Sequence, residues 1–335
     1  MKTTARIAMV SFLHGAVDFL CAFAVYGVFH NPEDPFLVYL IYSFCAFALQ
    51  MPMGIVLDYL CLKKGAVHAP YGFAFLGAWL TLAGVFLGPV TLGIGNALFH
   101  TGGGVMTMLE DEKEGLHGRG LGVFVAPGAV GLFLGGYAKE DMKVMIVLSA
   151  CVLFAAAFAL LYRLEEKKIQ IKRDHALPET AVLSSVAACF LVVVLRSGIG
   201  LSVSFPWKTG FFLSFLAVLA LAAGKAIGGF FGAAAGLLKT ALISLSLSAV
   251  FFIGKDIPVF GLSALFLFNM TMPLTLYALA KRMNGMHGTA FGILTFALFI
   301  GFVLVHAGWF DLPYAGTIGS LVSLCLLNPN LKGIS

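Results

Sequence analysis

Charged residues are scarce in this chain. Only 11% of its 335 residues are Asp, Glu, Lys or Arg, whereas about a quarter are charged in an average soluble domain. This scarcity excludes an ordinary soluble globular protein, and a net charge of only +5 does not suit a nucleic-acid-binding surface. The small positive balance is instead what Lys- and Arg-rich loops on the cytoplasmic side of a membrane produce.

Recognisable cysteine and metal motifs are absent as well. None of the six cysteines has C-x-x-C spacing, which excludes a disulfide framework and a zinc ribbon and predicts small core residues. The chain also lacks H-E-x-x-H or comparable ligand spacing. We therefore expect no bound metal, no cofactor and no enzymatic activity.

Long apolar runs make up most of the sequence. Hydrophobic residues are 60% of the chain, and the mean hydropathy is +0.98. The runs are about 20 residues long, enough for a helix to cross the bilayer, and too continuously apolar for barrel strands. The sequence predicts an all-α polytopic membrane protein with twelve membrane-spanning helices. Their expected ranges are 7–29, 36–60, 69–89, 91–109, 119–138, 143–163, 181–203, 210–232, 239–254, 257–280, 288–308 and 313–328.

A polar interval from Arg163 to His175 divides these spans equally. We expect two six-helix, pseudo-symmetric halves, 1–163 and 181–335, joined by a cytoplasmic linker over 164–180. With both termini cytoplasmic, fifteen of the 21 Lys and Arg residues lie inside, because four fall in outer loops and two within spans. The outer four are Lys139, Lys143, Lys208 and Lys255, and the two within spans are Arg196 and Lys225. The chain is thus predicted to be a multi-pass protein of the cytoplasmic membrane.

A few polar residues fall near the middle of spans, where they are costly and usually functional. Spans 1 and 4 each contain a polar pair four residues apart, and therefore on one helix face. Spans 7 and 10 contain one such residue each. The candidates for a central cavity are His14, Asp18, Asn96, His100, Arg196 and Asn269. The acidic run Glu110, Asp111, Glu112 and Glu114 ends span 4 and is predicted to be a solvated loop, although Glu110 could reach an inner gate.

Glycine-containing motifs occur at three places. After span 2 a glycine precedes an aspartate by four residues, and two lysines follow; the residues are Gly54, Asp58, Lys63 and Lys64. The corresponding site after span 8 has Gly224, Lys225, Gly228 and Gly229, but Ala233 at the acidic position. Span 5 contains Pro127, Gly128 and Gly131. Small residues allow close helix packing, and a flexible gate segment is the alternative.

These features resemble the major facilitator superfamily over nearly the whole chain. The motif after span 2 is similar to the cytoplasmic gate signature of that superfamily, and span 5 is similar to its antiporter element. The H-x-x-x-D of span 1 and G-N-A-L-F-H of span 4 resemble the fosmidomycin-resistance type of proton-coupled exporters. The resemblance implies a cavity lined by the first, fourth, seventh and tenth helices, and a weaker or differently built gate in the second half.

The predicted function is secondary active transport of a small organic solute by alternating access, as a proton-coupled exporter. Burial raises the pKa of a carboxyl group and a nearby cation lowers it, so contacts made and broken around Asp18 could couple protons to the solute. The alternatives are uptake of a small organic anion bound by Arg196, a divalent-metal transporter using His14, Asp18 and His100, and a non-transporting membrane sensor or enzyme. The expected partners are a small-molecule substrate, protons and the lipid bilayer, with the protein as a monomer.

Overall fold

The computed structural model describes residues 3–29, 34–66, 68–138 and 179–334. Within these ranges the secondary structure is helical, without a strand. The first group of helices is α1 (Thr3–Phe23) with the π-helix η1 (Ala24–Val28), α2 (Pro35–Ser43), the π-helix η2 (Phe44–Ala48), α3 (Gln50–Lys63), α4 (Ala69–Leu87), α5 (Pro89–Lys113) and α6 (Arg119–Tyr137). The second group is α8 (Glu179–Ser202), α9 (Gly210–Ala235), α10 (Leu237–Ile253), α11 (Pro258–Asn269), α12 (Thr271–Arg282), α13 (His287–His306) and α14 (Ala315–Asn330).

Most predicted spans coincide with these helices. Among the described residues, eight helices are long and apolar enough to cross a membrane, and α10 is a shorter apolar helix. The second predicted span corresponds to α2, η2 and α3 in succession, and the tenth to α11 and α12. Predicted span 143–163 and linker residues 164–178 lie outside the described residues, so neither the count of twelve nor the linker is tested.

Proline and glycine set several helix ends. Pro35, Pro89 and Pro258 each begin a helix, where the missing N–H and the fixed φ angle of proline suit the first turn. Pro273 interrupts span 10: it cannot donate to the carbonyl of Asn269, and α11 ends at that asparagine. Asn269 therefore lies at a helix break, a feature that binding sites of membrane transporters often contain.

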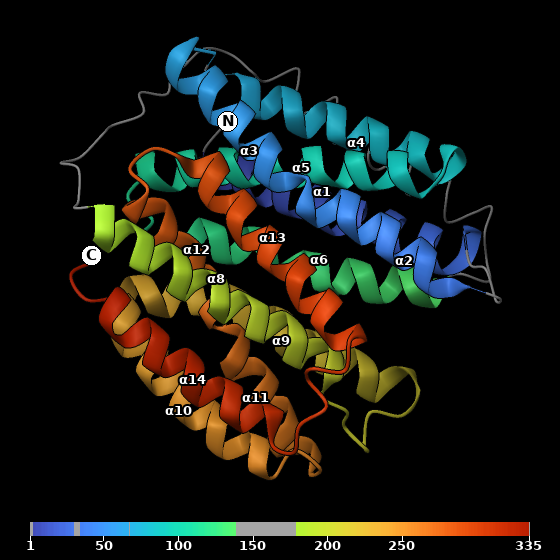
Figure 1. The fold of residues 1–335 in the computed structure, drawn as a ribbon, viewed down its shortest axis with the longest axis vertical. Coiled ribbons are helices and arrows are strands. Elements are labelled where there is room, and N and C mark those ends of the chain that lie inside the picture. Colours follow the sequence, from blue (N-terminus) through green and yellow to red (C-terminus); the bar gives the residue numbers. More distant parts are fainter. Residues whose placement is uncertain (1–2, 30–33, 67, 139–178, 335) are drawn as a thin grey trace.

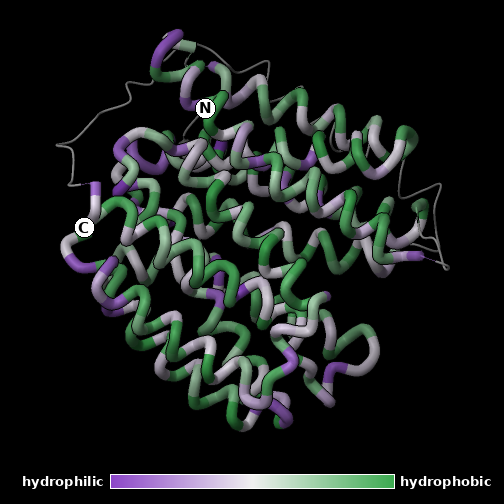
Figure 2. Tube along the Cα trace, viewed as in Figure 1, coloured by the Kyte–Doolittle hydropathy of each residue, from purple (hydrophilic) through white to green (hydrophobic). Residues whose placement is uncertain are grey.

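Figure 1 shows the blue-to-green helices mostly in the upper part of the view and the yellow-to-red ones mostly in the lower part, with α13 crossing over the green helices. The chain enters α1 and leaves α14 at the same end of the bundle, which we call the terminal side. Hydrophobic residues cover most of each helix in Figure 2, and hydrophilic segments lie mostly at helix ends. One large cluster of buried apolar residues runs through both groups.

Glycines bring the helices of the first group into backbone contact. A methyl group added at Gly131 or Gly135 of α6 would meet the backbone oxygen of Gly15 or Phe19 of α1. Small residues permit such close packing, which supplies the attraction between helices in a lipid solvent. Gly131, part of the predicted span 5 element, therefore has a packing role.

The two groups meet along two helix pairs, α3 with α13 and α6 with α9. On the terminal side the approach is close, because a methyl group at Gly54 of α3 would meet the carbonyl group of Gly288 on α13. On the opposite side the described contacts include aromatic pairs, such as Phe36 with Phe302 and Tyr137 with Phe211. The terminal side is thus closed by backbone packing, and side chains bridge the other side.

Candidate functional site

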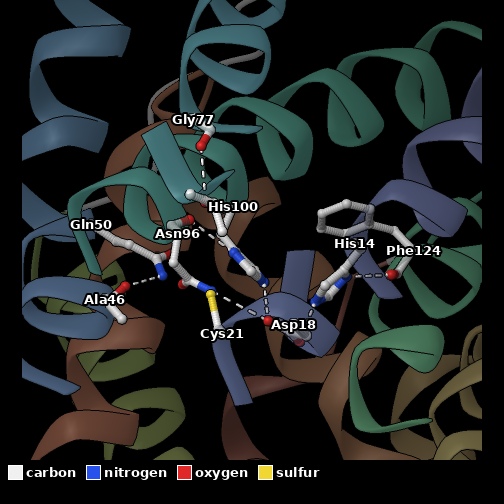
Figure 3. Close-up of polar contacts among 10 residues, drawn as sticks. His14, Asp18, Cys21, Ala46, Gln50, Gly77, Asn96, His100 and Phe124 are labelled. Atoms are coloured by element: carbon white, nitrogen blue, oxygen red, sulfur yellow. Dashed lines mark hydrogen bonds and ion pairs between the residues drawn. The ribbon is translucent and has the colours of Figure 1, made fainter. Parts of the chain in front are cut away.

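Asp18 is the centre of a buried polar cluster. Its Oδ2 lies 3.2 Å from Nε2 of His14, and its Oδ1 lies 3.4 Å from Nε2 of His100. Asn96 donates from Nδ2 to the same Oδ1 over 3.3 Å. None of the four side chains is more than slightly exposed, and Figure 3 shows the carboxylate between the two histidine rings. We call His14, Asp18, Asn96 and His100 the Asp18 cluster.

Helix periodicity explains why these four residues converge. His14 and Asp18 are four residues apart on α1, and Asn96 and His100 are four apart on α5, so each pair shares one face. The helices α1 and α5 are in contact, with those faces toward each other. The structure therefore brings together all four candidates that the sequence placed on spans 1 and 4.

The histidine hydrogen bonds restrict the proton arrangements that the cluster can adopt. Nδ1 of His14 lies 2.7 Å from the carbonyl oxygen of Phe124, and Nδ1 of His100 lies 2.9 Å from that of Asn96. A carbonyl oxygen only accepts, so each Nδ1 carries a proton. Each Nε2 then faces the carboxylate either as a lone pair, which repels it, or as a protonated donor, which binds it. A proton or metal ion between Nε2 and the carboxylate removes the repulsion.

The span 5 element packs directly on this cluster. A methyl group at Gly128 of α6 would meet Oδ2 of Asp18 and Nε2 of His14. Only a residue without a side chain leaves room for the carboxylate and ring in their observed positions. Pro127 packs on Gly15 of α1, one residue beyond His14. The motif is thus the wall of the Asp18 cluster.

The second helix group contributes two cations, Arg196 and Lys225, and the second of them lies within electrostatic range of Asp18. Arg196 of α8 is 8% exposed, and its Nη1 has no hydrogen-bond partner among the described residues. Lys225 of α9, grouped with the gate motif by its sequence position, is partly buried within electrostatic range of both Arg196 and Asp18. Lys225 is therefore close to the polar centre, like the candidates that were selected because they fall near the middle of predicted spans.

The other candidate, Asn269, is less directly connected. It is 6% exposed and donates from Nδ2 to the carbonyl oxygen of Leu265, in its own helix, over 2.8 Å. Neither Asn269 nor Arg196 has a described hydrogen bond to the Asp18 cluster. The sequence grouped the polar residues of spans 1, 4, 7 and 10 around one cavity. Among the described hydrogen bonds, those that join these residues connect only spans 1 and 4, within the first helix group.

One neighbour of the cluster, Cys21, and one further buried polar residue, Gln50, were missed in the sequence. Asn96 Nδ2 lies 3.4 Å from Sγ of Cys21, so this cysteine contacts the polar centre. Gln50, at the start of α3, is 1% exposed; it donates to the carbonyl oxygen of Ala46, and its Oε1 has no partner among the described residues. A glutamine inside an apolar run is the signal that could have identified it.

Asp58 joins the two helix groups on the terminal side. Its carboxylate accepts from the backbone N–H groups of Gly288 and Thr289 at 2.8 and 2.7 Å, and from the Thr289 hydroxyl at 2.6 Å. These donors belong to the first turn of α13, where N–H groups have no partner inside the helix and the dipole favours an anion. Lys63 and Lys64 of the same motif are exposed at the end of α3.

A second polar contact between the groups lies beside the first. Glu112 of α5 is 3.3 Å from Nζ of Lys281 and 3.3 Å from Nε2 of His287, on α12 and α13. Nearby, Nδ1 of His117 lies 3.3 Å from the hydroxyl of Tyr277. We call the Asp58 contact with α13 and the Glu112 contacts with Lys281 and His287 the terminal latch.

The prediction of a solvated acidic loop at the end of span 4 was wrong for its first two residues. Glu110 is 1% exposed and accepts from Arg6 at 2.7 Å. Asp111 is equally buried and accepts from the backbone N–H groups of Gly118 and Gly120, at the start of α6. α5 continues to Lys113, beyond the predicted end of the span, and carries both carboxylates into the protein.

The Asp18 cluster also has the donor set of a transition-metal site. One ligand atom from each of His14, Asp18 and His100 lies within 4.8 Å of the others. Two imidazoles and a carboxylate suit zinc or ferrous iron, and an Nδ1–H bound to a backbone carbonyl is the usual support of a metal-ligating histidine. The residues thus fit such an ion, although the sequence led us to expect none.

Comparison with solved structures identifies the fold. FucP, the fucose:proton symporter of E. coli, in its outward conformation gives a TM-score of 0.69 at 14% identity, covering 100% of this chain and 99% of that one. The human organic anion transporter MFSD10 gives 0.65 at 15% identity, with 97% and 98% covered. A bacterial homologue of the iron transporter ferroportin, in its outward-facing state, gives 0.60 at 12% identity, with 98% of each covered.

No protein-family model matches the sequence, and no curated protein matches it either. The similarity therefore lies in the arrangement of the helices, and the low identities leave the substrate undetermined. Helical composition, apolar spans and full-length superposition agree with one another. The chain has the fold of the major facilitator superfamily transporters.

Proposed function

We propose that the protein is a secondary transporter of the cytoplasmic membrane that couples a small organic solute to protons by alternating access. The Asp18 cluster carries the proposal, since two histidine Nε2 atoms face one buried carboxylate and need a cation between them. A proton is the simplest such cation. A fucose:proton symporter with the same fold adds support.

The cluster can bind and release protons because the charges of Asp18 and the two histidines balance only at certain numbers of bound protons. Loss of a proton from His14 or His100 leaves a lone pair facing Asp18, and gain of one by Asp18 removes its ion pair with both rings. Either change alters the attraction between α1 and α5, which carry the two histidines. The titratable groups around Asp18 are His14, His100, Cys21, Tyr42 and Lys225.

The terminal latch is the proposed gate. With the terminal side taken as cytoplasmic, the latch closes the protein toward the cytoplasm while Asp58 caps α13. Opening must break the three Asp58 hydrogen bonds and separate Gly54 from Gly288. The motif resemblance to the superfamily gate signature supports this assignment.

Export remains our proposal from the span 5 element and from the likeness of spans 1 and 4 to the fosmidomycin-resistance exporters. The packing of Gly128 and Gly131 on α1 weakens the first of these supports, because the contact alone accounts for the small residues. Direction depends on whether proton and solute compete for the protein or bind together. Competition produces antiport and export, and joint binding produces symport and uptake.

The proton coupling is tested by Asp18→Asn, which mimics a permanently protonated carboxyl group. Purified protein is reconstituted into liposomes that contain a pH-sensitive dye, and gradients of small organic acids, amines, sugars and amino acids are applied. We expect wild-type protein to move protons with at least one solute, and Asp18→Asn to exchange that solute without proton movement. Transport of the solute by wild-type protein without any proton flux would refute the coupling.

A divalent metal is the second candidate solute, because His14, Asp18 and His100 form a three-ligand set. An iron transporter homologue with this fold gives a modest precedent. The same liposomes, loaded with a metal-sensitive dye, distinguish the two functions. Manganese, ferrous or zinc uptake that His100→Gln abolishes would favour metal transport, and absence of uptake would eliminate it.

A further inference from the structure

Arg196 is a buried cation that has no ion-pair partner among the described residues. It is 8% exposed, its Nη1 lacks a hydrogen-bond partner, and no described carboxylate lies within ion-pair distance. Arg6 provides the contrast, since its Nη1 is 2.7 Å from Oε1 of Glu110. Removal of a guanidinium from water costs several kcal/mol, which native structures normally offset with a paired anion.

Lys225 makes this imbalance larger. It lies on α9, beside α8 in sequence, and its charge acts on that of Arg196. Like charges at short range repel one another, and the described residues offer Lys225 no ion pair. Two cations have thus been placed together inside the second helix group, without a carboxylate of that group beside them.

Asp18 is the carboxylate within electrostatic range of Lys225, but it does not complete the balance. Its carboxylate oxygens already contact the side chains of His14, His100 and Asn96, which all belong to the first helix group. Among the described residues around Arg196 and Lys225, the positive charge therefore exceeds the negative charge. An anion from outside the chain would correct the excess and occupy the free Nη1 of Arg196.

We propose that Arg196 and Lys225 bind the transported solute, and that this solute is a small organic anion with a carboxylate or phosphate group. Guanidinium groups bind such oxyanions through two parallel hydrogen bonds, and an ammonium group adds a point charge. This substrate class rests on the proposed transport function. It adds a second cation, Lys225, to the alternative function in which Arg196 alone binds a small organic anion. It also excludes sugars and amines as the main substrates.

Binding is tested with protein in phosphatidylcholine nanodiscs, which contain no anionic lipid. Thermal unfolding is followed by tryptophan fluorescence with lactate, succinate, benzoate or glycerol phosphate. The uncharged controls are lactamide, succinamide, benzamide and glycerol. We expect at least one anion to raise the melting temperature while its uncharged control does not.

Variants identify the binding residues. Arg196→Gln and Lys225→Gln should each weaken anion binding by about 30-fold or more, as truncation of one partner of a buried charge pair does. Lys208→Gln removes an exposed lysine of the same helix group and should bind as wild type. Arg196→Lys keeps the charge and should retain part of the affinity, which separates lost binding from misfolding.

The proposal is overturned if no anion stabilises wild-type protein, or if Arg196→Gln responds to anions as wild type does. These outcomes are independent of the proton-coupling test, because the binding assay has no pH gradient. Anion binding without proton flux in liposomes would refute the coupling alone. Proton flux driven by an uncharged solute, without anion binding, would refute the anion site alone.

Discussion

At the residue scale, the chemistry of the protein depends on a few polar side chains in an apolar chain. The carboxylate of Asp18 has two imidazole partners, whereas the guanidinium of Arg196 has an unsatisfied nitrogen. A satisfied buried ion pair is weak evidence for function, because pairing offsets its cost. Arg196 and the Asp18 cluster are the stronger signals, since each can take a ligand that the described residues do not supply.

Gly128→Ala tests whether the geometry of the Asp18 cluster matters for transport. The added methyl group meets Oδ2 of Asp18 and Nε2 of His14, so one of these groups must move. We expect at least a tenfold loss of proton-coupled transport, in the same liposome assay, with the protein still inserted. Gly136→Ala on the same helix is the control, since its methyl group makes only ordinary contact with Tyr26. Equal activity of both variants would show that the cluster tolerates displacement.

At the element scale, two aspartates perform the same task in different places. Asp58 caps α13 from the other helix group, and Asp111 caps α6 within its own group. Both use the free N–H groups and positive dipole end of a helix N-terminus. Only the Asp58 contact must break when the groups separate, so only this cap can control the conformational equilibrium.

Asp58→Asn should shift the protein toward the state that is open on the terminal side. Replacement of a charged acceptor by a neutral one weakens the cap of α13 by about 1–2 kcal/mol, which is roughly a tenfold change in the closed-to-open ratio. Spin labels at the exposed Lys64 and Lys332, on the two groups, measure the distance distribution between the groups.

The control for this shift is Asp111→Asn. It removes a comparable cap but should lower the melting temperature without a change in the distance distribution, because α6 and α5 belong to one group. A distribution that Asp58→Asn leaves unchanged would show that the terminal latch does not depend on Asp58.

At the scale of the whole molecule, the closed terminal side and the asymmetric loop charges describe one orientation. The described residues of the terminal side include Lys63, Lys64, Lys281 and Arg282, whereas Lys208 and Lys255 lie on the opposite side. Lys and Arg accumulate in cytoplasmic loops, so the terminal side should face the cytoplasm.

The orientation is tested with single cysteines at Lys64 and Lys208, which are both exposed. The exposed Cys325 and Cys151, which lies outside the described residues, are replaced by serine, and the four buried cysteines remain. A membrane-impermeant thiol reagent applied to intact cells should label the cysteine at position 208, and the one at position 64 only after permeabilisation. Labelling of both in intact cells would contradict the predicted topology.

The sequence by itself determined the helices, because a bilayer admits only segments that satisfy their own backbone hydrogen bonds. Continuous apolar runs therefore marked most spans, and the four-residue spacing placed His14 with Asp18 and Asn96 with His100. Tertiary structure alone decided which faces meet. It placed Cys21 against the polar centre and Lys225 within electrostatic range of Arg196, and it buried Gln50, Glu110 and Asp111. Spacing fixes neighbours within one helix, but a contact between helices depends on packing that no single segment encodes.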